Sequence, residues 1–232
     1  MNRSIRILAV SRMDGGVCVA GVEESSGRWI RPVKDYGSVL KTDLYDADGE
    51  VIEPLDLVTF NVIRRQPSPP HVEDRITAFD RPLEHEERPE SDEERRTILA
   101  SLSEGSPDDV LIRKTRSLVL VRPDEISMVS FDPNSFGKYK VRLSFTLSGR
   151  AYQGEARSSP GYPVTDIRLR NWGRRYGTRK IMTGPQLRQA LKVDEIYLVL
   201  GLARPMNGAI WPMDVGFHTV PDFDGSIDLK KP

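Results

Sequence analysis

Residues 5–33 read IRILAVSRMDGGVCVAGVEESSGRWIRPV, and this stretch decides the fold class. It contains three short apolar runs that two turn sequences separate. The runs are residues 5–10, 17–22 and 29–33, and the turns are DGG at 14–16 and SSG at 25–27. Short runs rich in β-branched residues and bounded by glycine are typical of strands rather than helices. The N-terminal part is therefore expected to form a small barrel or sandwich of short strands.

The rest of the chain contains a second block of strand-like sequence behind an acidic segment. Further strands are expected at 55–63, 117–121, 139–147, 195–203 and 209–220, and a short helix at 167–176. Between the blocks, Ser91-Asp92-Glu93-Glu94 is a capping box that predicts the start of a helix. The sequence therefore predicts a mainly β fold with short helices (β-barrel, α+β). A first unit is expected at 1–82, an acidic helical connector at 83–110 and a second unit at 111–232.

The charges are distributed unevenly along a chain whose formal net charge is zero. Residues 138–192 hold thirteen basic side chains and two acidic ones, whereas residues 84–109 hold ten acidic side chains and three basic ones. A concentrated basic segment favours binding to an anion, and nucleic acid is the large anion of the cytoplasm. Three interpretations of the acidic segment stay open. It lies on another face of the protein, it covers the basic face until a ligand displaces it, or the two segments neutralise each other in surface ion pairs.

Composition excludes some classes of protein. The single cysteine, Cys18, rules out a scaffold of intramolecular disulfides. No apolar run approaches the roughly 18 residues of a membrane span, and residues 1–6 lead into a strand without the apolar core of a signal peptide. A soluble, cytoplasmic protein without a membrane partner is the expectation.

The strand at 29–33 carries a first basic-aromatic group, made by Arg28, Trp29 and Arg31. Side chains alternate along a strand, so Trp29 and Arg31 are expected to share one face. In one interpretation the indole stacks on a base, worth about 1–3 kcal/mol, while the guanidinium holds the phosphate. In the other interpretation Trp29 belongs to the core and Arg31 lies at its rim.

The expected helix at 167–176 carries the densest group of this kind. Arg168, Trp172 and Arg175 fall at i, i+4 and i+7, which places two cations beside one ring on a single face. In the alternative interpretation Trp172 packs the helix onto the barrel and the arginines are solvated. The full set of expected nucleic-acid contacts is Arg28, Trp29, Arg31, Lys140, Arg142, Arg168, Arg170, Trp172, Arg174, Arg175, Arg179 and Lys180. The sequence TGP at 183–185, just behind them, is either a phosphate-binding loop or an ordinary turn.

Catalysis has one candidate site, formed by His71, Glu73 and Asp74. These residue types can act as acid and base or hold a metal. One histidine with carboxylates is too little for a zinc site, and the chain has no Cys-x-x-Cys, Walker or Gly-x-Ser-x-Gly sequence. In the alternative interpretation, His71 pins a loop to the barrel through hydrogen bonds. No cofactor and no metal are expected, and a protein that is not an enzyme is favoured.

Short patterns along nearly the whole chain resemble the prokaryotic dual OB-containing domain family. They are residues 7–13, 16–22 and 27–33, His71-Val72-Glu73-Asp74, Val164-Thr165-Asp166 through Trp172, and residues 200–205. The resemblance implies two tandem OB-like barrels and nucleic-acid recognition, often in bacterial defence systems. It implies no active site.

Together, these observations predict a non-catalytic nucleic-acid-binding module that senses single-stranded or modified nucleic acid, DNA or RNA, in a bacterial defence system. The alternative is a protein-interaction or regulatory subunit, in which the acidic and basic segments contact each other or a partner protein of that system. A further alternative is a metal-dependent nuclease whose site is formed by His71, Glu73 and Asp74.

Overall fold

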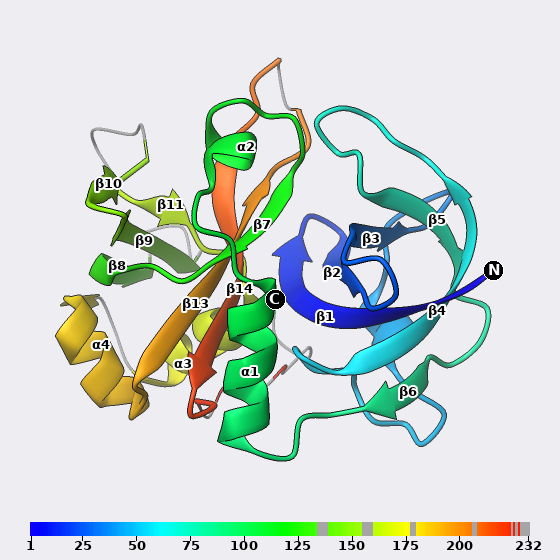
Figure 1. Cartoon of the computed structure of the whole chain (residues 1–232), viewed down its shortest axis with the longest axis horizontal. Coiled ribbons are helices and arrows are strands. Elements are labelled where there is room, and N and C mark those ends of the chain that lie inside the picture. Colours follow the sequence, from blue (N-terminus) through cyan, green and yellow to red (C-terminus); the bar gives the residue numbers. More distant parts are fainter. Residues whose placement is uncertain are drawn as a thin grey trace.

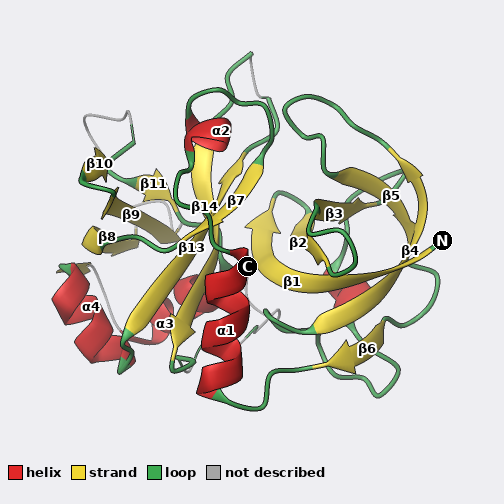
Figure 2. Ribbon diagram, viewed as in Figure 1, coloured by secondary structure: helices red, strands yellow, loops and turns green. Residues whose placement is uncertain are grey.

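The computed structural model describes residues 1–133, 139–154, 160–176, 180–205, 208–223, 225 and 227. Strands are the main element, and they form two β units that lie side by side (Figures 1 and 2). The predicted fold class, mainly β with short helices, is confirmed.

The first unit is a closed barrel of five strands. Its strands are β1 (Asn2–Met13), β2 (Gly16–Glu23), β3 (Trp29–Val33), β4 (Leu57–Arg65) and β5 (Asp74–Ala78). Neighbouring strands follow the order β1-β2-β3-β5-β4, and β4 pairs again with β1, which closes the ring. The β3–β5 pair is parallel and the other pairs are antiparallel. This ring is an OB-type barrel, and β6 (Glu84–Glu87) extends it from β4.

Strand β1 is buried on both faces. Ile5 and Ile7 point into the first barrel, where they pack with Phe60. Leu8 points the other way and packs against the second unit. A strand covered on both sides needs apolar residues at successive positions rather than at alternate ones, which explains the unbroken run at 7–10.

The second unit consists of two sheets around one core. Its strands are β7 (Leu118–Val121), β8 (Glu125–Pro133), β9 (Tyr139–Leu147), β10 (Arg150–Tyr152), β11 (Tyr162–Pro163), β12 (Lys180–Met182), β13 (Glu195–Leu202) and β14 (Pro212–Val220). One sheet has the order β10-β9-β8-β12 with β11 beside β9, and the other has the order β14-β13-β7. Val121, Phe145, Leu198 and Phe217 come from both sheets and meet in the same buried cluster. The alternating apolar residues of β9 thus bury one face, as predicted.

A separate apolar cluster joins the two units. It contains Leu8 and Trp29 from the first barrel, Leu99 from α1 (Asp92–Leu102), and Tyr197 and Val215 from β13 and β14. Strand β14 approaches β1 so closely that a Cβ on Gly216 would lie 2.3 Å from the Leu8 carbonyl oxygen. Because this interface is apolar and tightly packed, we expect the two units to behave as one body.

Helix α1 begins where the capping box predicted. The Ser91 hydroxyl accepts a hydrogen bond from the Glu94 N–H at 3.1 Å. The Glu94 carboxylate accepts from the Glu90 N–H at 2.9 Å, one residue earlier than a standard capping box. The expected connector range, 83–110, therefore contains β6, α1 and most of α2 (Asp108–Leu111).

The acidic helix lies against β13 and β14, and its own arginines attach it there. Arg95 donates to the Thr219 carbonyl oxygen at 2.8 Å, and Arg96 donates to the Glu195 carboxylate at 2.6 Å. The carboxylates of its first turn lie at the helix N-terminus, where negative charge stabilises the helix dipole. These contacts place α1 on β13 and β14 rather than over the basic helix α3 (Ile167–Tyr176).

Residues 183–185 begin a helix, α4 (Gly184–Leu191), which the sequence analysis took for a phosphate loop or a turn. The side-chain oxygen of Gln186 accepts from the Thr183 N–H at 2.9 Å. Pro185 lies in the first turn, where its missing N–H is no loss. Thr183 and Gln186 therefore form a capping box that the sequence analysis overlooked.

Candidate nucleic-acid interface and inter-barrel pocket

His71 and Glu73 lie at the junction of the two units, where each contacts a residue of the second unit. The Nε2 of His71 lies 3.2 Å from the carbonyl oxygen of Ala203. The Glu73 carboxylate accepts from the N–H and the hydroxyl of Ser117, at 2.7 and 3.0 Å. In both pairs the partners are far apart in sequence, so these contacts hold the two units together.

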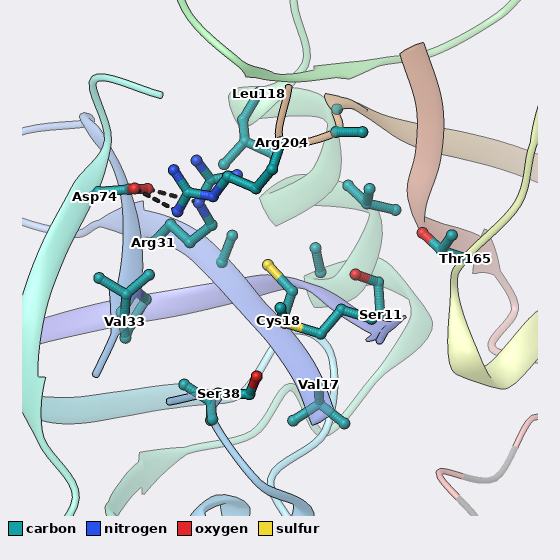
Figure 3. Close-up of a pocket in the computed structure, with 18 of the residues that line it drawn as sticks. Ser11, Val17, Cys18, Arg31, Val33, Ser38, Asp74, Leu118, Thr165 and Arg204 are labelled. Carbon is teal, nitrogen blue, oxygen red and sulfur yellow. Dashed lines mark hydrogen bonds and ion pairs between the residues drawn. The ribbon is translucent and has the colours of Figure 1, made fainter. Parts of the chain in front are cut away.

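Asp74 also joins the units, through one of its two arginine partners. Its Oδ1 accepts from the Nε of Arg31 in the same barrel at 2.7 Å, and its Oδ2 accepts from Arg204 of the second unit (Figure 3). Burial, together with the positive charges of Arg31 and Arg204, lowers the pKa of His71 to about 4. The imidazole is therefore neutral at pH 7. Because a carbonyl oxygen only accepts, the proton of His71 is on Nε2.

This geometry supports the interpretation of His71 as a residue that pins a loop, rather than as an acid, base or metal ligand. Both carboxylates of the trio are occupied by buried donors of the fold. In the described part of the chain, no group of three or more His, Cys, Asp or Glu side chains is placed to hold a metal ion.

A cavity of about 750 Å³ lies between the two units, beside the Asp74 ion cluster (Figure 3). The first barrel contributes Ser11, Val17, Cys18 and Arg31 to its walls, and the second unit contributes Leu118, Thr165, Met213 and Arg204. The sequence analysis named Arg31 as a nucleic-acid contact and Asp74 as part of a candidate catalytic site, and it predicted no cavity beside them. The sequence analysis missed Arg12 and Arg204, which also line the cavity, although both lie within the stretches that carry the family resemblance.

Strand β3 does not present its predicted stacking face at the surface. Trp29 is 9% exposed and packs in the apolar cluster between the units. Arg31 is 6% exposed and is paired with Asp74, whereas Arg28 lies exposed in the preceding turn. The interpretation of Trp29 as a core residue agrees with this placement.

Helix α3 buries two of the three residues that were predicted to share an exposed face. Asp166 caps the helix by accepting from the Leu169 N–H at 2.7 Å. Arg168 is 3% exposed because it turns inward and pairs with Asp222 at 2.7 Å. Trp172 is buried in the core of the second unit, and Arg175 is the exposed member of the trio.

The C-terminal end of α3, unlike Arg168 and Trp172, brings cations and aromatic rings together near the surface. The Arg174 guanidinium lies 5.3 Å from the centre of the Tyr139 ring, and the Lys180 ammonium lies 4.2 Å from that of Tyr176. Tyr176 is 44% exposed and stacks on the buried Trp172. We call Tyr139, Arg174, Tyr176 and Lys180 the α3 surface. The sequence analysis named its two cations and placed Tyr176 in the same basic-aromatic helix, but it gave Tyr139 no role in binding.

Arg170 is a half-buried cation next to the α3 surface. It donates to the carbonyl oxygens of Val164 at 3.0 Å and Tyr139 at 2.6 Å. Burial and the neighbouring charges of Arg174 and Arg12 lower the pKa of Arg170 to about 10, so it stays charged at pH 7. Arg12 and Arg170 are held at neighbouring residues, because the Arg12 N–H donates to the Thr165 carbonyl oxygen and Arg170 donates to that of Val164.

The remaining predicted contacts lie around this surface. Lys140 is exposed on β9, and Arg142 is half-buried on the same strand, where burial lowers its pKa. Arg179 lies outside the described residues.

A family model for the dual OB-containing domain matches residues 3–214. The match covers most of the chain, so this protein belongs to the dual OB-containing domain family. The closed first barrel and the second β unit are accordingly its two OB-type units in tandem. Neither a curated protein nor a solved structure matches the chain. Among the described residues, no helix is long and apolar enough to cross a membrane.

Proposed function

We propose that this protein is a non-catalytic module that binds single-stranded nucleic acid through the α3 surface. The observation that carries the proposal is the pairing of cations with aromatic rings there, the half-buried Arg174 with Tyr139 and the exposed Lys180 with Tyr176. Single strands are bound by cations that contact the backbone and by rings on which bases stack. OB-type units commonly use a sheet face and its loops for this purpose.

The electrostatics of this surface support an anionic ligand. In the described part of the chain, the Arg174 and Lys180 side chains lie over aromatic rings rather than against carboxylates. Arg170 and Arg12 add positive charge next to them. Several cations without carboxylate partners repel one another, and phosphate groups would relieve that repulsion.

The proposal extends to the biological role that the family resemblance implies, the sensing of single-stranded or modified nucleic acid in a bacterial defence system. A partner protein of such a system would then respond to the bound strand. Fold alone does not settle such a role. It is tested by whether the strand that binds most tightly carries a modification or an unpaired segment.

The first experiment is fluorescence anisotropy with labelled single-stranded DNA, single-stranded RNA and duplex, at low and at near-physiological salt. The variant Arg174→Ala/Lys180→Ala is expected to bind about tenfold more weakly. The slope of log K against log salt should become shallower by about 0.7 for each phosphate that the variant no longer neutralises.

The matched control is Arg65→Ala/Arg81→Ala, which removes two exposed cations from the first barrel. The control should bind as the unchanged protein does, and both double variants should keep its melting temperature. Equal affinity of the α3 variant and the unchanged protein would overturn the assignment of this surface. Absence of binding by the unchanged protein at low salt would favour the alternative of a protein-interaction subunit.

A further inference from the structure

The cavity between the two units has the size and composition of a small-molecule site. Its volume of about 750 Å³ lies within the range of about 300–1,000 Å³ that is common for ligand pockets. Its middle is apolar, with walls that include Val17, Ala20, Leu118 and Val215. Figure 3 shows Arg31, Asp74 and Arg204 together at one end of the cavity and Ser11 and Thr165 at another, and Ser38 is a further polar residue of its wall.

Arg31 has a buried donor that the protein does not use. Its Nε donates to Asp74, but its Nη2 is buried and has no hydrogen-bond partner among the described residues. A buried donor without an acceptor is unfavourable. The side chain lines the cavity, so an acceptor atom of a ligand can satisfy it.

The chemistry of this end favours a neutral acceptor rather than a phosphate. Arg31 and Arg204 share the Asp74 carboxylate, and the Glu73 carboxylate also acts on Arg31, so two negative charges already balance the two positive ones. Moving a phosphate out of water into an apolar cavity is also costly. A keto oxygen of a planar ring accepts a hydrogen bond without either cost, and the apolar walls suit the ring itself.

The other end favours an anion. Arg12 is exposed and lines the cavity together with Asp14, and among the described residues its guanidinium is not within ion-pair distance of a carboxylate. Its backbone N–H is fixed on the Thr165 carbonyl oxygen at 2.8 Å, which ties this mouth to both units. The charge of Arg170 lies nearby. A phosphate held by Arg12 would stay in contact with water.

We propose that the cavity between the two units binds one nucleotide, with its base between the apolar walls, a keto oxygen on Arg31 Nη2 and its phosphate beside Arg12. The nucleotide is either free or part of a strand, and only in the second case does the inference rest on the proposed function. Uracil, thymine, cytosine and guanine carry a ring carbonyl oxygen, whereas adenine has none. Adenine nucleotides are therefore expected to bind about tenfold more weakly.

The single cysteine of the chain provides a direct test. Cys18 is partly exposed and lines the cavity, so a bound nucleotide should slow its reaction with a thiol reagent. The probes are uridine 5′-monophosphate, adenosine 5′-monophosphate, and oligouridylate and oligoadenylate of equal length. Protection by the uridine monophosphate shows a free nucleotide, and protection by oligouridylate alone shows a nucleotide of a strand.

Two variants test the orientation of the ligand. Arg12→Ala should weaken binding of uridine monophosphate and leave the weaker binding of uridine unchanged, because uridine has no phosphate. Arg31→Lys keeps the positive charge beside Asp74 but removes the Nη2 donor, so it should abolish the preference for uridine over adenosine nucleotides. Urea unfolding of Arg31→Lys confirms that the variant folds.

The proposal is overturned if no nucleotide or oligonucleotide slows the reaction of Cys18. It is also overturned if adenine and uracil nucleotides protect equally. Failure of the proposed function looks different, because it appears as unchanged oligonucleotide affinity in Arg174→Ala/Lys180→Ala. In that double variant, protection of Cys18 by uridine monophosphate should persist.

Discussion

The carboxylate of Glu73 accepts two hydrogen bonds from Ser117, one from its N–H at 2.7 Å and one from its hydroxyl at 3.0 Å. Glu73 immediately precedes β5 of the first barrel, and Ser117 immediately precedes β7 of the second unit. Both residues are buried. This pair therefore fixes the entry of the chain into the second unit against the end of the first, next to the pocket.

Replacing Glu73 with Ala should destabilise the protein by about 2–3 kcal/mol, because two buried donors of Ser117 would be left without their charged acceptor. Urea unfolding measures the change. The control is Glu84→Ala, on the exposed strand β6, which should shift the free energy of unfolding by less than about 0.5 kcal/mol. Equal effects of the two substitutions would show that the Glu73–Ser117 pair adds nothing to stability.

Arg168 and Arg174 lie on the same helix but are expected to behave in opposite ways. Arg168 donates to the carbonyl oxygens of Gly225 and Phe223 and pairs with Asp222. Arg168→Ala should therefore lower the stability by about 3 kcal/mol. Arg174→Ala should lower nucleic-acid affinity while the melting temperature stays within about 2 °C. Thermal unfolding and anisotropy on both variants check this, and a stable Arg168→Ala with weakened binding would contradict it.

Two buried histidines predict a loss of stability in mild acid. Burial is the main cause that lowers the pKa of His71 to about 4 and that of His218 to about 3. In the unfolded chain both titrate near 6.5, so the unfolded state binds more protons below that pH. The free energy of unfolding has its full value, as far as these histidines are concerned, above pH 6.5. It decreases as the pH falls toward 4, by up to about 1.4 kcal/mol per pH unit for each histidine.

Urea unfolding at pH 7.5, 6.5, 5.5 and 4.5 measures that loss. His71→Gln should flatten the curve, because an amide can donate to the Ala203 carbonyl oxygen without gaining a proton. Identical pH dependence of the variant and the unchanged protein would show that His71 does not titrate on unfolding.

The buried carboxyl group of Asp214 marks a position at which we expect a neutral substitution to stabilise the protein. It is fully buried, and burial together with the nearby charge of Asp166 raises its pKa well above the ordinary value. Burial likewise raises the pKa of Asp166 to about 6. An acid whose folded pKa is raised holds its proton longer in the folded state, so stability falls as the pH rises from about 4.

Asp214→Asn should therefore raise the melting temperature at pH 8, and the gain should shrink toward pH 4.5. Differential scanning at the two values measures it. Val215→Ala, a neutral change at the next position, is the control and should show no such pH-dependent difference. A lower melting temperature of Asp214→Asn at pH 8 would mean that the charged carboxylate is required.

Local patterns in the sequence predicted most of the elements. The runs at 5–10, 17–22 and 29–33, the alternation of β9 and the cap at Ser91 all describe interactions between residues close in the chain. The period of a strand or helix fixes which side chains share a face. The OB-type arrangement followed from these elements together with the family resemblance.

The tertiary structure alone decided which of those faces meets solvent. Trp29 and Arg168 carry the right chemistry for a ligand, but the packing of the second unit buries one and the C-terminal segment around Asp222 engages the other. The cavity likewise needs Arg31 and Arg204, which are far apart in sequence. The sequence by itself determined where the cations and rings lie along the chain, and only the docking of one β unit on the other determined which of them remain available, because burial depends on surfaces that no local period describes.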